Sequence, residues 1–487
     1  MSIDLQPTGI VFRPDNRRVL VRPFITSDAG SIRHIIDRAL SLGPSGVEEQ
    51  LALIRADFDA RHVDLEDRWR RNFELVKAYV PEGVPIDDNL RLYLGALFSG
   101  EYALESAALF NPSIVAHPDQ SGVPAGSVRY ILSLRATGEG HISSIEFRSG
   151  IIHADATIEV DEVSRFVIAP GVKENPTYRK TIFQHKLQEM GFENDWSWKV
   201  IDSLGNDFTR RQLEEAMARA TEGIETLSRE IERTRECVQW LAKSNYEVHF
   251  QPATTLSQRI IFPVSPNETN GIEDARFVRF VDDDGSVVYY ATYTAYNGHA
   301  ILPQFIETRD FASFAVCTLN GQAVQNKGMA LFPRRINGRY AMISRQDDEN
   351  LFLMTSDNIH FWNEPQLLRR PTMPWEFVKI GNCGSPLETE AGWLVITHGV
   401  GPMRRYCIGA ILLDLDDPSQ VIGWLEKPLI EPSGEYREGY VPNVVYSCGA
   451  MLHGSRLILP YALSDTSSTV VTLEIGELLA ALTRPSL

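Results

Sequence analysis

Short strand-like segments separated by turns fill most of the sequence after about Asn111. The first of them span residues 127–135, 141–148 and 151–160, and after Tyr246 such segments continue almost to the end of the chain. Many short strands with turn residues between them are typical of an all-β architecture. With 487 residues, the chain is long enough to bury a substantial core and to form more than one domain.

The N-terminal part departs from this pattern. Residues 9–12 and 18–22 are interpreted as a strand pair on either side of a turn. From about Ser27, apolar residues recur at helical spacing in three stripes, which predicts a helical region. We therefore expect residues 1–104 to form a strand pair and a helical region, and residues 105–487 to form the β-rich domain.

An insertion interrupts the β-rich domain at about residues 175–245, where helical periodicity returns. Thr209 and Gln212 have the spacing of a capping box at the start of a helix. Apolar residues from 213 to 241 then recur in alternating steps of four and three, as in a coiled-coil seam over about four heptads. We expect this helix to pack on its own chain. The alternative is that it pairs with another subunit in a homo-oligomer.

The composition excludes several classes of function. The net charge is −17, and a surface this acidic opposes binding to a phosphate backbone, so no nucleic-acid partner is expected. An acidic surface also repels small anions at long range, so any phosphate site needs a local basic pocket. No apolar stretch is long enough to span a bilayer, so no membrane partner is expected.

The cysteines and the N-terminus bear on the location of the protein. The chain has five cysteines without metal-type spacing, which predicts free buried thiols, no bound metal and a reducing compartment. Residues 1–6 do not show a basic region followed by an apolar run, as a secretory signal would. A cytoplasmic location is therefore expected.

The stretch 270–276 is the strongest candidate for chemistry. Two adjacent carboxylates, Glu273 and Asp274, and the cation of Arg276 lie between a glycine turn and the strand-like residues 277–281. Neighbouring side chains of an extended segment point to opposite faces. We therefore expect Glu273 and Asp274 to face opposite ways, with Asp274 and Arg276 on one side. The alternative is that Asp274 only caps the turn before the strand.

Together with residues 293–298, the stretch 271–276 resembles the active-site motif of glycoside hydrolase family 130, which contains β-mannoside phosphorylases and β-mannosidases. Further similar motifs follow in the family's order, at Asn111-Pro112, 327–340, Thr397–Val400, Leu412–Leu415, Val441–Val444 and 461–466. The resemblance covers about residues 105–475 without the insertion. It implies a mainly β protein, a five-bladed β-propeller with the active site at its axial end. This chain would add the helical N-terminal region and the long helical insertion.

By this resemblance, Asp274 supplies the proton to the glycosidic oxygen, and the nucleophile attacks the sugar from the opposite face. Since phosphate is already anionic, a phosphorylase needs cations to hold it rather than a second carboxylate. Family motifs and positions near strand ends assign this role to Arg135, Lys327, Arg345 and His398. The sugar is expected to contact Asn111, Glu273, Arg276, Tyr296, Asn297 and Asp465.

Departures from the family pattern keep a hydrolase open. Where phosphorylases of the family often carry a second arginine, this chain has His141, with Glu139 close by. Glu438 lies in a glycine-containing loop that is expected to face the axis. We assign His141 and Glu438 to substrate binding. In an inverting hydrolase, either Glu139 or Glu438 is a candidate for the required base.

The sequence therefore predicts an inverting β-mannoside phosphorylase that releases α-mannose 1-phosphate from β-1,2- or β-1,4-mannosides. Inorganic phosphate is its expected co-substrate, no cofactor is expected, and its partners are a β-mannoside oligosaccharide and phosphate. An inverting β-mannosidase on the same scaffold is the first alternative. A non-catalytic carbohydrate-binding propeller is the second.

Overall fold

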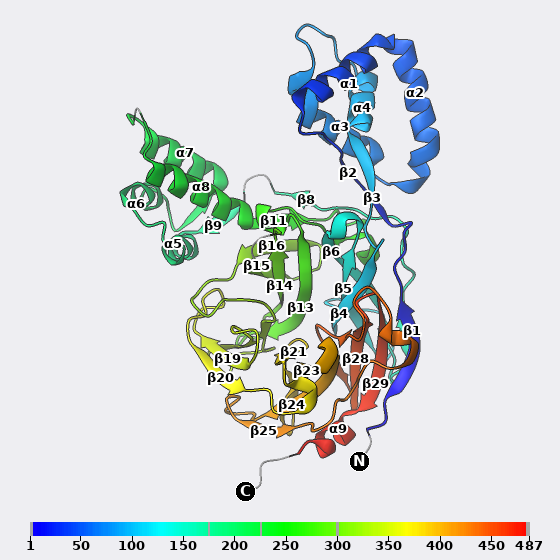
Figure 1. Cartoon of the computed structure of the whole chain (residues 1–487), viewed down its shortest axis with the longest axis vertical. Helices are drawn as coiled ribbons and strands as arrows, with labels where there is room; N and C mark the ends of the chain where they lie inside the picture. The colour runs from blue at the N-terminus through cyan, green and yellow to red at the C-terminus, as the bar shows by residue number, and fades with distance from the viewer. Residues whose placement is uncertain (1–2, 174–175, 225, 299–300, 484–487) are drawn as a thin grey trace.

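Antiparallel sheets of neighbouring strands build most of the chain, which the computed structural model describes over residues 3–173, 176–224, 226–298 and 301–483 (Figure 1). The first group contains β4 (Ala108–Ala116), β5 (Val128–Thr137), β6 (Ser143–Ile152) and β7 (Ile158–Val160). The second contains β13 (Gly271–Val281), β14 (Val287–Tyr296), β15 (Ile301–Thr308) and β16 (Ser313–Thr318). Gly271 pairs in parallel with Ser143 and joins the two groups. They share one eleven-stranded sheet with β8 (Gly171–Val172), β11 (Tyr246–His249) and β12 (Ile260–Ile261).

Three further groups follow along the chain. The third contains β17 (Ala330–Leu331), β18 (Tyr340–Ser344), β19 (Leu351–Ser356) and β20 (Pro365–Arg369). The fourth contains β21 (Lys379–Asn382), β22 (Leu387–Thr389), β23 (Gly392–Val400), β24 (Tyr406–Leu413) and β25 (Val421–Trp424). The last contains β26 (Val445–Tyr446), β27 (Met451–His453), β28 (Arg456–Leu463) and β29 (Ser467–Glu474), and it takes up the N-terminal strand β1 (Gln6–Phe12).

Hydrophobic cores fill the space between successive groups. Phe147 of β6 and Phe277 of β13 lie in the core between the first two groups. The next three cores join the second group to the third, the third to the fourth and the fourth to the last. A further core holds Leu132 of β5 and Val470 of β29, so the last group packs against the first. The mainly β architecture predicted from the sequence is confirmed.

The two N-terminal strands do not pair with each other, contrary to the sequence prediction. β1 pairs with β29 near the other end of the chain, whereas β2 (Val19–Pro23) pairs with β3 (Ser99–Ala103). Each strand is drawn to a different core, because Phe12 packs with Val470 while Leu20 packs with Tyr102. Burial against distant partners therefore outweighs the local hairpin.

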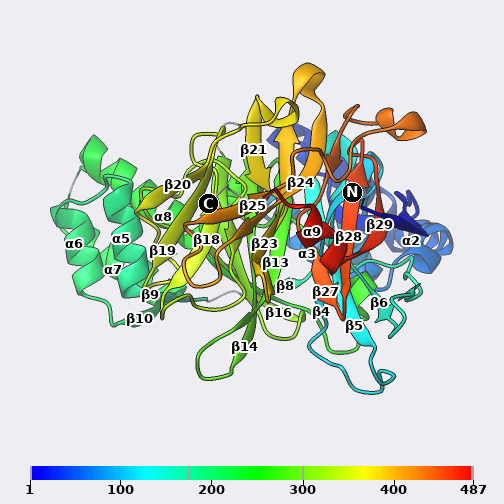
Figure 2. The ribbon, with the colours of Figure 1, turned by 90° about the horizontal axis from the view of Figure 1, so that it is seen from below.

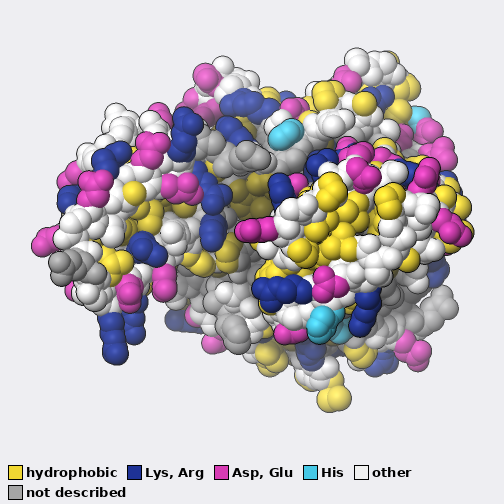
Figure 3. Space-filling view, turned by 90° about the horizontal axis from the view of Figure 1, so that it is seen from above, with side chains coloured by type: hydrophobic (Ala, Val, Ile, Leu, Met, Phe, Trp, Pro, Cys, Tyr) yellow, Lys and Arg dark blue, Asp and Glu magenta, His cyan; other side chains and the backbone are white. Residues whose placement is uncertain are grey.

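Four helices complete the N-terminal region: α1 (Ala29–Ser41), α2 (Gly43–Phe58), α3 (Leu65–Val76) and α4 (Asp88–Leu97). The predicted stripes mostly face inward, since Ile36, Leu51 and Phe73 lie in one core. Leu53 is exposed, because it is two positions from the buried Leu51 and only residues three or four apart share a helix face. Figure 3 shows apolar side chains gathered on the upper surface of this region.

Four buried ionisable side chains connect the N-terminal segment to the first strand group. Arg18 lies 2.8 Å from Glu105 and 2.6 Å from Glu146. Arg148 lies 2.8 Å from Glu105 and 3.1 Å from Glu146. Each carboxylate therefore contacts both guanidinium groups. These contacts are needed because an unpaired charge is costly in the protein interior.

The helical insertion contains two helices where the sequence predicts one continuous seam. α7 (Arg210–Thr221) ends just before Gly223, whose φ of 78° is typical of a helix C-terminus, and α8 (Arg229–Ser244) follows. The predicted capping box is present, with Thr209 N donating to Gln212 Oε1 at 2.8 Å and Gln212 N donating to Thr209 Oγ1 at 3.4 Å. Packing on the same chain is confirmed by the insertion's own core, which buries Leu213, Met217, Val238 and Leu241.

The rest of the insertion consists of α5 (Lys180–Glu189), α6 (Asp195–Asp202) and a strand pair of β9 (Thr177–Arg179) and β10 (Asp207–Thr209). Its predicted start at residue 175 lies outside the described residues. Figure 2 shows, from below, the insertion and the N-terminal helices on opposite sides of the sheets. The short helix α9 (Ile475–Ala481) follows the last strand. In the described part of the chain, we find no helix that is long and apolar enough to cross a membrane.

Candidate active site

A bulge in β13 sets the geometry around Asp274. The pairing of β13 with β14 shifts register between Glu273 and Arg276, and Asp274 has a left-handed backbone with φ 55°. Such a bulge breaks the alternation of side chains along a strand, because the extra residue has no partner opposite. The prediction that Glu273 and Asp274 face opposite ways is therefore wrong. Arg135 contacts both, at 2.7 Å from Glu273 Oε1 and 3.3 Å from Asp274 Oδ1.

Asn111 reaches the same carboxylate from β4, which has a bulge of its own. The pairing of β4 with β5 shifts register between Phe110 and Ser113, and Asn111 has φ 51°. Its Nδ2 donates to Asp274 Oδ1 at 2.6 Å. The two residues are only 6% and 7% exposed. Two bulges thus bring together an amide and a carboxylate that lie far apart in the sequence.

Two carboxyl groups of the site have pKa values shifted in opposite directions. Burial alone would raise the pKa of Asp274, but the positive charges around it, chiefly Arg135 and Arg276, lower that pKa to about 2. Burial, and then the negative charge of Asp274, raise the pKa of Asp465 to about 7. Near neutral pH, Asp274 is ionised while Asp465 carries a proton about half of the time. Pairs of groups with separated pKa values are typical of sites that move protons.

Tyr446 connects this cluster to a second one. Arg276 donates to the backbone oxygen of Asp274 at 2.9 Å and to the hydroxyl of Tyr446 at 2.7 Å. The ring of Tyr446 lies 4.8 Å from that of His398, between centroids. His398 Nε2 accepts a hydrogen bond from Arg345 at 3.1 Å. The predicted phosphate ligands Arg345 and His398 are thereby linked to Asp274 through Arg276 and Tyr446.

His398 is held neutral, so it does not add the positive charge that we expected from all four basic residues. Its side chain is buried, and burial together with the charges of Arg345 and Arg276 lowers its pKa well below the usual value. The neutral ring donates from Nδ1 to the carbonyl oxygen of Asn382 at 3.2 Å and accepts at Nε2 from Arg345. His398 therefore orients Arg345 as a hydrogen-bonding group, without a charge of its own.

Lys327 is the most accessible of the predicted phosphate ligands, with a side chain that is 36% exposed. Its Nζ lies 3.8 Å from Glu273 Oε2. The loop after it is fixed from two sides, because Asn382 donates to the carbonyl oxygen of Gly328 and Thr292 donates to that of Met329. A cation at this separation from its carboxylate partner can turn to an anion that enters the site.

Three other predicted residues lie at or just after the ends of strands, since Tyr296 ends β14, Asn297 follows it and His141 lies in the turn between β5 and β6. The hydroxyl of Tyr296 donates to the carbonyl oxygen of Gly298 at 3.2 Å, so it closes its own turn, and the adjacent Asn297 is partly buried. His141 is exposed and bonds to Tyr440.

Glu139 and Glu438, the two candidates for a hydrolytic base, are also exposed. Among the described residues, neither carboxylate makes a hydrogen bond or ion pair with the groups around Asp274. The structure therefore does not bring them together with Asp274, whereas Asp465 is close enough for Asp274 to shift its pKa.

Sequence reasoning missed Tyr446, Asn382 and Tyr440. Tyr446 follows the family-like motif Val441–Val444 by only two residues, and Asn382 ends β21 before a glycine-containing turn. Their positions, beside a family-like motif and at the end of a strand, are the signals that could have identified Tyr446 and Asn382. Their roles depend on contacts with residues more than fifty positions away, which spacing within one motif cannot reveal.

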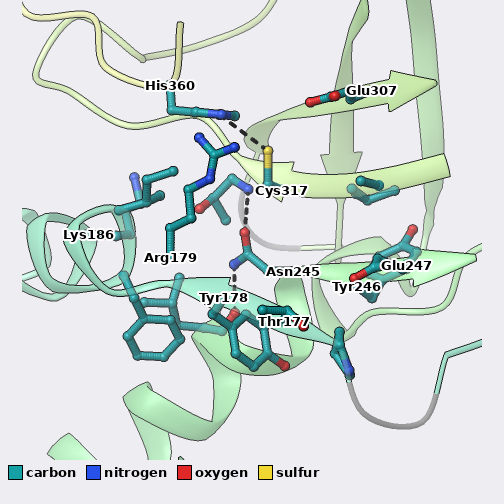
Figure 4. A pocket seen from close by; sticks show the side chains of 17 residues that line it. Thr177, Tyr178, Arg179, Lys186, Asn245, Tyr246, Glu247, Glu307, Cys317 and His360 are labelled. Atoms are coloured by element: carbon teal, nitrogen blue, oxygen red, sulfur yellow. Dashed lines mark hydrogen bonds between the residues drawn. The ribbon is translucent and has the colours of Figure 1, made fainter. Parts of the chain in front are cut away.

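A cavity lies where the insertion meets the sheet, lined among others by Arg179, Tyr178, Cys317 and His360 (Figure 4). Cys317 Sγ lies 3.6 Å from His360 Nδ1, a spacing also found in activated thiol–imidazole pairs. Burial raises the pKa of Cys317 to about 12 and lowers that of His360 to about 4. Both groups are neutral near pH 7, so this thiol is not activated as a nucleophile.

Comparison with known proteins places the chain in a family. The model of a family described as beta-1,4-mannooligosaccharide phosphorylase matches residues 239–484. A 1,2-beta-oligomannan phosphorylase from Thermoanaerobacter sp. (strain X514) is 33% identical over 228 residues, which are 45% of this chain and 75% of that protein. A beta-1,2-mannobiose phosphorylase from Listeria innocua serovar 6a is 30% identical over 247 residues, 49% of this chain and 67% of that protein.

A solved structure of beta-1,2-mannobiose phosphorylase from Listeria innocua, in complex with beta-1,2-mannobiose, aligns with 77% of this chain and 92% of that one. Its sequence identity is 22% and its TM-score is 0.46. Family membership rests on the family model and on the two sequence relatives. On their evidence, the chain belongs to glycoside hydrolase family 130.

Proposed function

We propose that the protein is an inverting β-mannoside phosphorylase that uses inorganic phosphate to release α-mannose 1-phosphate. The observation that carries this proposal is the buried Asp274 carboxylate, held by Asn111 and Arg135, with the accessible cation of Lys327 nearby. The relatives support the substrate class, because they are named for β-1,2-linked mannosides and the family model for β-1,4-linked ones. Either linkage is therefore a candidate.

The reaction forms one bond and breaks another at the anomeric carbon. A phosphate oxygen attacks this carbon while its bond to the glycosidic oxygen breaks, and the electron pair of that bond goes to the leaving oxygen. The leaving oxygen takes a proton that originates on Asp274 and passes through a sugar hydroxyl. Attack from the opposite face inverts the configuration, so a β-mannoside yields the α-phosphate.

The charges around Asp274 suggest how phosphate prepares the proton donor. Without ligands, Asp274 is ionised because Arg135 and other cations lower its pKa to about 2. A phosphate bound to Arg135 and Lys327 would offset part of their positive charge and raise the pKa of Asp274 again. Asp465, which carries a proton about half of the time near pH 7, is the adjacent group from which a proton can be redistributed.

We further infer that the five strand groups of residues 105–487 are the blades of a five-bladed propeller. Cores between successive groups support this architecture, and so does the core that joins the last group to the first. The pairing of β1 with β29 is consistent with a ring whose final blade uses strands from both ends of the chain. The domain boundary near residue 105 then separates the helical region α1–α4 from the ring.

The protein uses phosphate as its co-substrate, and the proposed mechanism requires no cofactor. The five free cysteines fit a reducing compartment such as the cytoplasm. The seam that motivated a homo-oligomer is used in the insertion's own core, so an oligomer would need a different surface.

Incubation with β-1,2-mannobiose, with and without inorganic phosphate, tests the proposal. Phosphate-dependent appearance of mannose 1-phosphate supports it. Release of mannose at the same rate without phosphate would favour the β-mannosidase, with Asp465 as the first candidate for its base. If the protein binds the disaccharide but cleaves it under neither condition, the carbohydrate-binding alternative is correct. In that test Asp274→Asn is the control, because it should abolish turnover and leave sugar binding nearly intact.

A further inference from the structure

An aromatic residue and a histidine from distant loops meet next to the candidate active site. The hydroxyl of Tyr440 lies 2.8 Å from His141 Nδ1, and the two rings are 5.7 Å apart between centroids. Tyr440 remains 47% exposed although its hydroxyl is engaged. A large apolar ring face is therefore presented to solvent in a fixed orientation.

The loop of Tyr440 is attached to the segment that carries Asp465. The backbone N of Tyr440 donates to Thr466 Oγ1 at 2.8 Å, and the backbone N of Val441 donates to the carbonyl oxygen of Ser464 at 3.0 Å. Gly439 fits there without a side chain, since a Cβ would come within 2.4 Å of Thr466 Oγ1. These contacts are made to the residues on either side of Asp465, whose pKa is raised by the charge of Asp274, so Tyr440 lies beside the segment that adjoins Asp274.

The turn that carries His141 adjoins the site from the other side. It connects β5 to β6, and the side chains at the ends of these strands include Arg135 and Ser143, which are bonded at 2.9 Å. His141 has a left-handed backbone with φ 62°. A left-handed residue other than glycine requires support from its surroundings.

The N-terminal region supplies that support. The hydroxyl of Tyr102, on β3, lies 2.9 Å from the carbonyl oxygen of Glu139 and 3.0 Å from that of Ile142, and it can donate to either. These two carbonyls lie on either side of His141 in the chain, that of Ile142 directly after it and that of Glu139 two residues before it. The contact connects the extra N-terminal region, which the family model does not match, to the rim of the candidate site.

We propose that Tyr440 is a stacking platform for the sugar on the leaving-group side, and that His141 and Tyr102 hold the platform in place. This inference rests on the proposed function, because it assumes that the β-mannoside is cleaved at Asp274. The mannosyl unit that is transferred to phosphate contacts the buried groups around Asp274. The leaving sugar therefore extends outward past Asp465 to the exposed ring of Tyr440. An aromatic face suits the apolar face of a pyranose. A ring fixed beforehand loses little conformational freedom when the sugar binds.

Synthesis in the reverse direction separates the two sides of the site. With mannose 1-phosphate as donor and mannose as acceptor, Tyr440→Ala should raise KM for the acceptor about tenfold or more, since it removes an apolar contact of roughly 1.4 kcal/mol or more. KM for mannose 1-phosphate should stay within about twofold of the wild type. Tyr440→Phe keeps the ring but loses the bond to His141, so its KM for the acceptor should lie between those of the wild type and of Tyr440→Ala.

Two further variants complete the test. Phe24→Ala removes another exposed aromatic side chain, 77% exposed in the N-terminal region, and should leave both KM values unchanged. Tyr102→Phe removes the support of the turn and should raise KM for the acceptor severalfold, without the same effect on mannose 1-phosphate. An unchanged acceptor KM in Tyr102→Phe would overturn the role of the N-terminal region. An equal rise of both KM values in Tyr440→Ala would overturn the platform.

A binding measurement keeps this inference distinguishable from the proposed function. Calorimetric titration of β-1,2-mannobiose into Asp274→Asn, and into Asp274→Asn with Tyr440→Ala, requires no turnover. A Kd about tenfold higher in the double variant supports the platform even if the wild type proves to be a hydrolase. Equal Kd values would overturn the platform even if the wild type is a phosphorylase.

Discussion

Asn111 and Asp274 are joined by a hydrogen bond of 2.6 Å, and both residues have left-handed backbones in strand bulges. The two bulges bring these side chains together, and regular strands would not. The bond also helps to hold the pKa of Asp274 low. We interpret Asn111 as the group that fixes the orientation of Asp274, the proposed proton donor.

Two replacements of Asn111 separate the effect of its side chain on activity from the effect of its backbone conformation on stability. Asn111→Gly removes the amide but tolerates φ 51°, so kcat for β-mannoside phosphorolysis should fall about a hundredfold while the fold stays stable. Asn111→Ala should lose a similar amount of activity and, in addition, about 1 kcal/mol of stability or more, because Ala is strained in this conformation. Steady-state kinetics and urea unfolding of both variants test this. Wild-type kcat in Asn111→Gly would contradict the assigned role.

Lys327 provides the most direct test of the phosphate site. Lys327→Met removes the charge at similar length, and KM for phosphate should rise about tenfold or more, since a hydrogen bond to a charged group contributes roughly 1.5–3 kcal/mol. KM for the mannoside should change much less. Lys173→Met is the matched control. Lys173 is exposed and pairs with Glu247 at 2.8 Å, so its replacement should leave both KM values unchanged. A larger effect on the mannoside than on phosphate would argue against this assignment.

Asp465 should make stability depend on pH. Its pKa is 3.8 in its ordinary state and about 7 in the folded protein, so the folded state binds its proton more tightly. The stabilisation from this protonation is fully present below pH 3.8 and is lost as pH rises through 7. Asp465→Asn has no charge to bury, and Asn tolerates the left-handed backbone of this position.

The variant should therefore raise the free energy of unfolding at pH 8 by up to about 4 kcal/mol, the upper limit set by the shift in pKa. At pH 4 the change should be small. Urea unfolding of wild type and variant at the two pH values measures the difference. The same change at both values would show that Asp465 does not titrate as described.

The buried charges around Arg18 predict a large effect on stability. Arg18→Met leaves Glu105 and Glu146 with one guanidinium instead of two, which should lower the free energy of unfolding by about 3–5 kcal/mol. Arg17→Met is the neighbouring control, because Arg17 is exposed and pairs with Asp15 on the surface, and it should change stability little. Comparable losses in the two variants would mean that the buried cluster does not anchor the N-terminal segment.

The sequence was sufficient for the kind of fold and for the centre of the site. Short strand-like segments between turns predicted the strands, and family-like motifs selected Asp274, Arg135 and Lys327, which do come together. Such predictions succeed because strand-forming and turn-forming residues are signals within a short stretch of chain. The role of each of these residues stays a prediction until variants are measured.

Other features depended on information that no local pattern holds. The strand rule put Glu273 and Asp274 on opposite faces, because alternation gives no sign of a bulge. His398 was expected to be charged, but it is buried and neutral. Its burial between Arg345 and Tyr446 depends on three separate strand groups, whose arrangement no local pattern shows. The pairing of β1 with β29 was missed because the partner lies at the other end of the chain.

The stoichiometry of products from β-1,2-mannobiose tests the central claim most directly. Time-resolved proton and phosphorus NMR in the presence of phosphate should show one α-mannose 1-phosphate for each mannose released, because phosphate takes one sugar and the other leaves. The phosphate ester should form directly in the α configuration. Two molecules of mannose for each disaccharide, with no phosphate ester, would contradict phosphorolysis at Asp274 and identify water as the nucleophile.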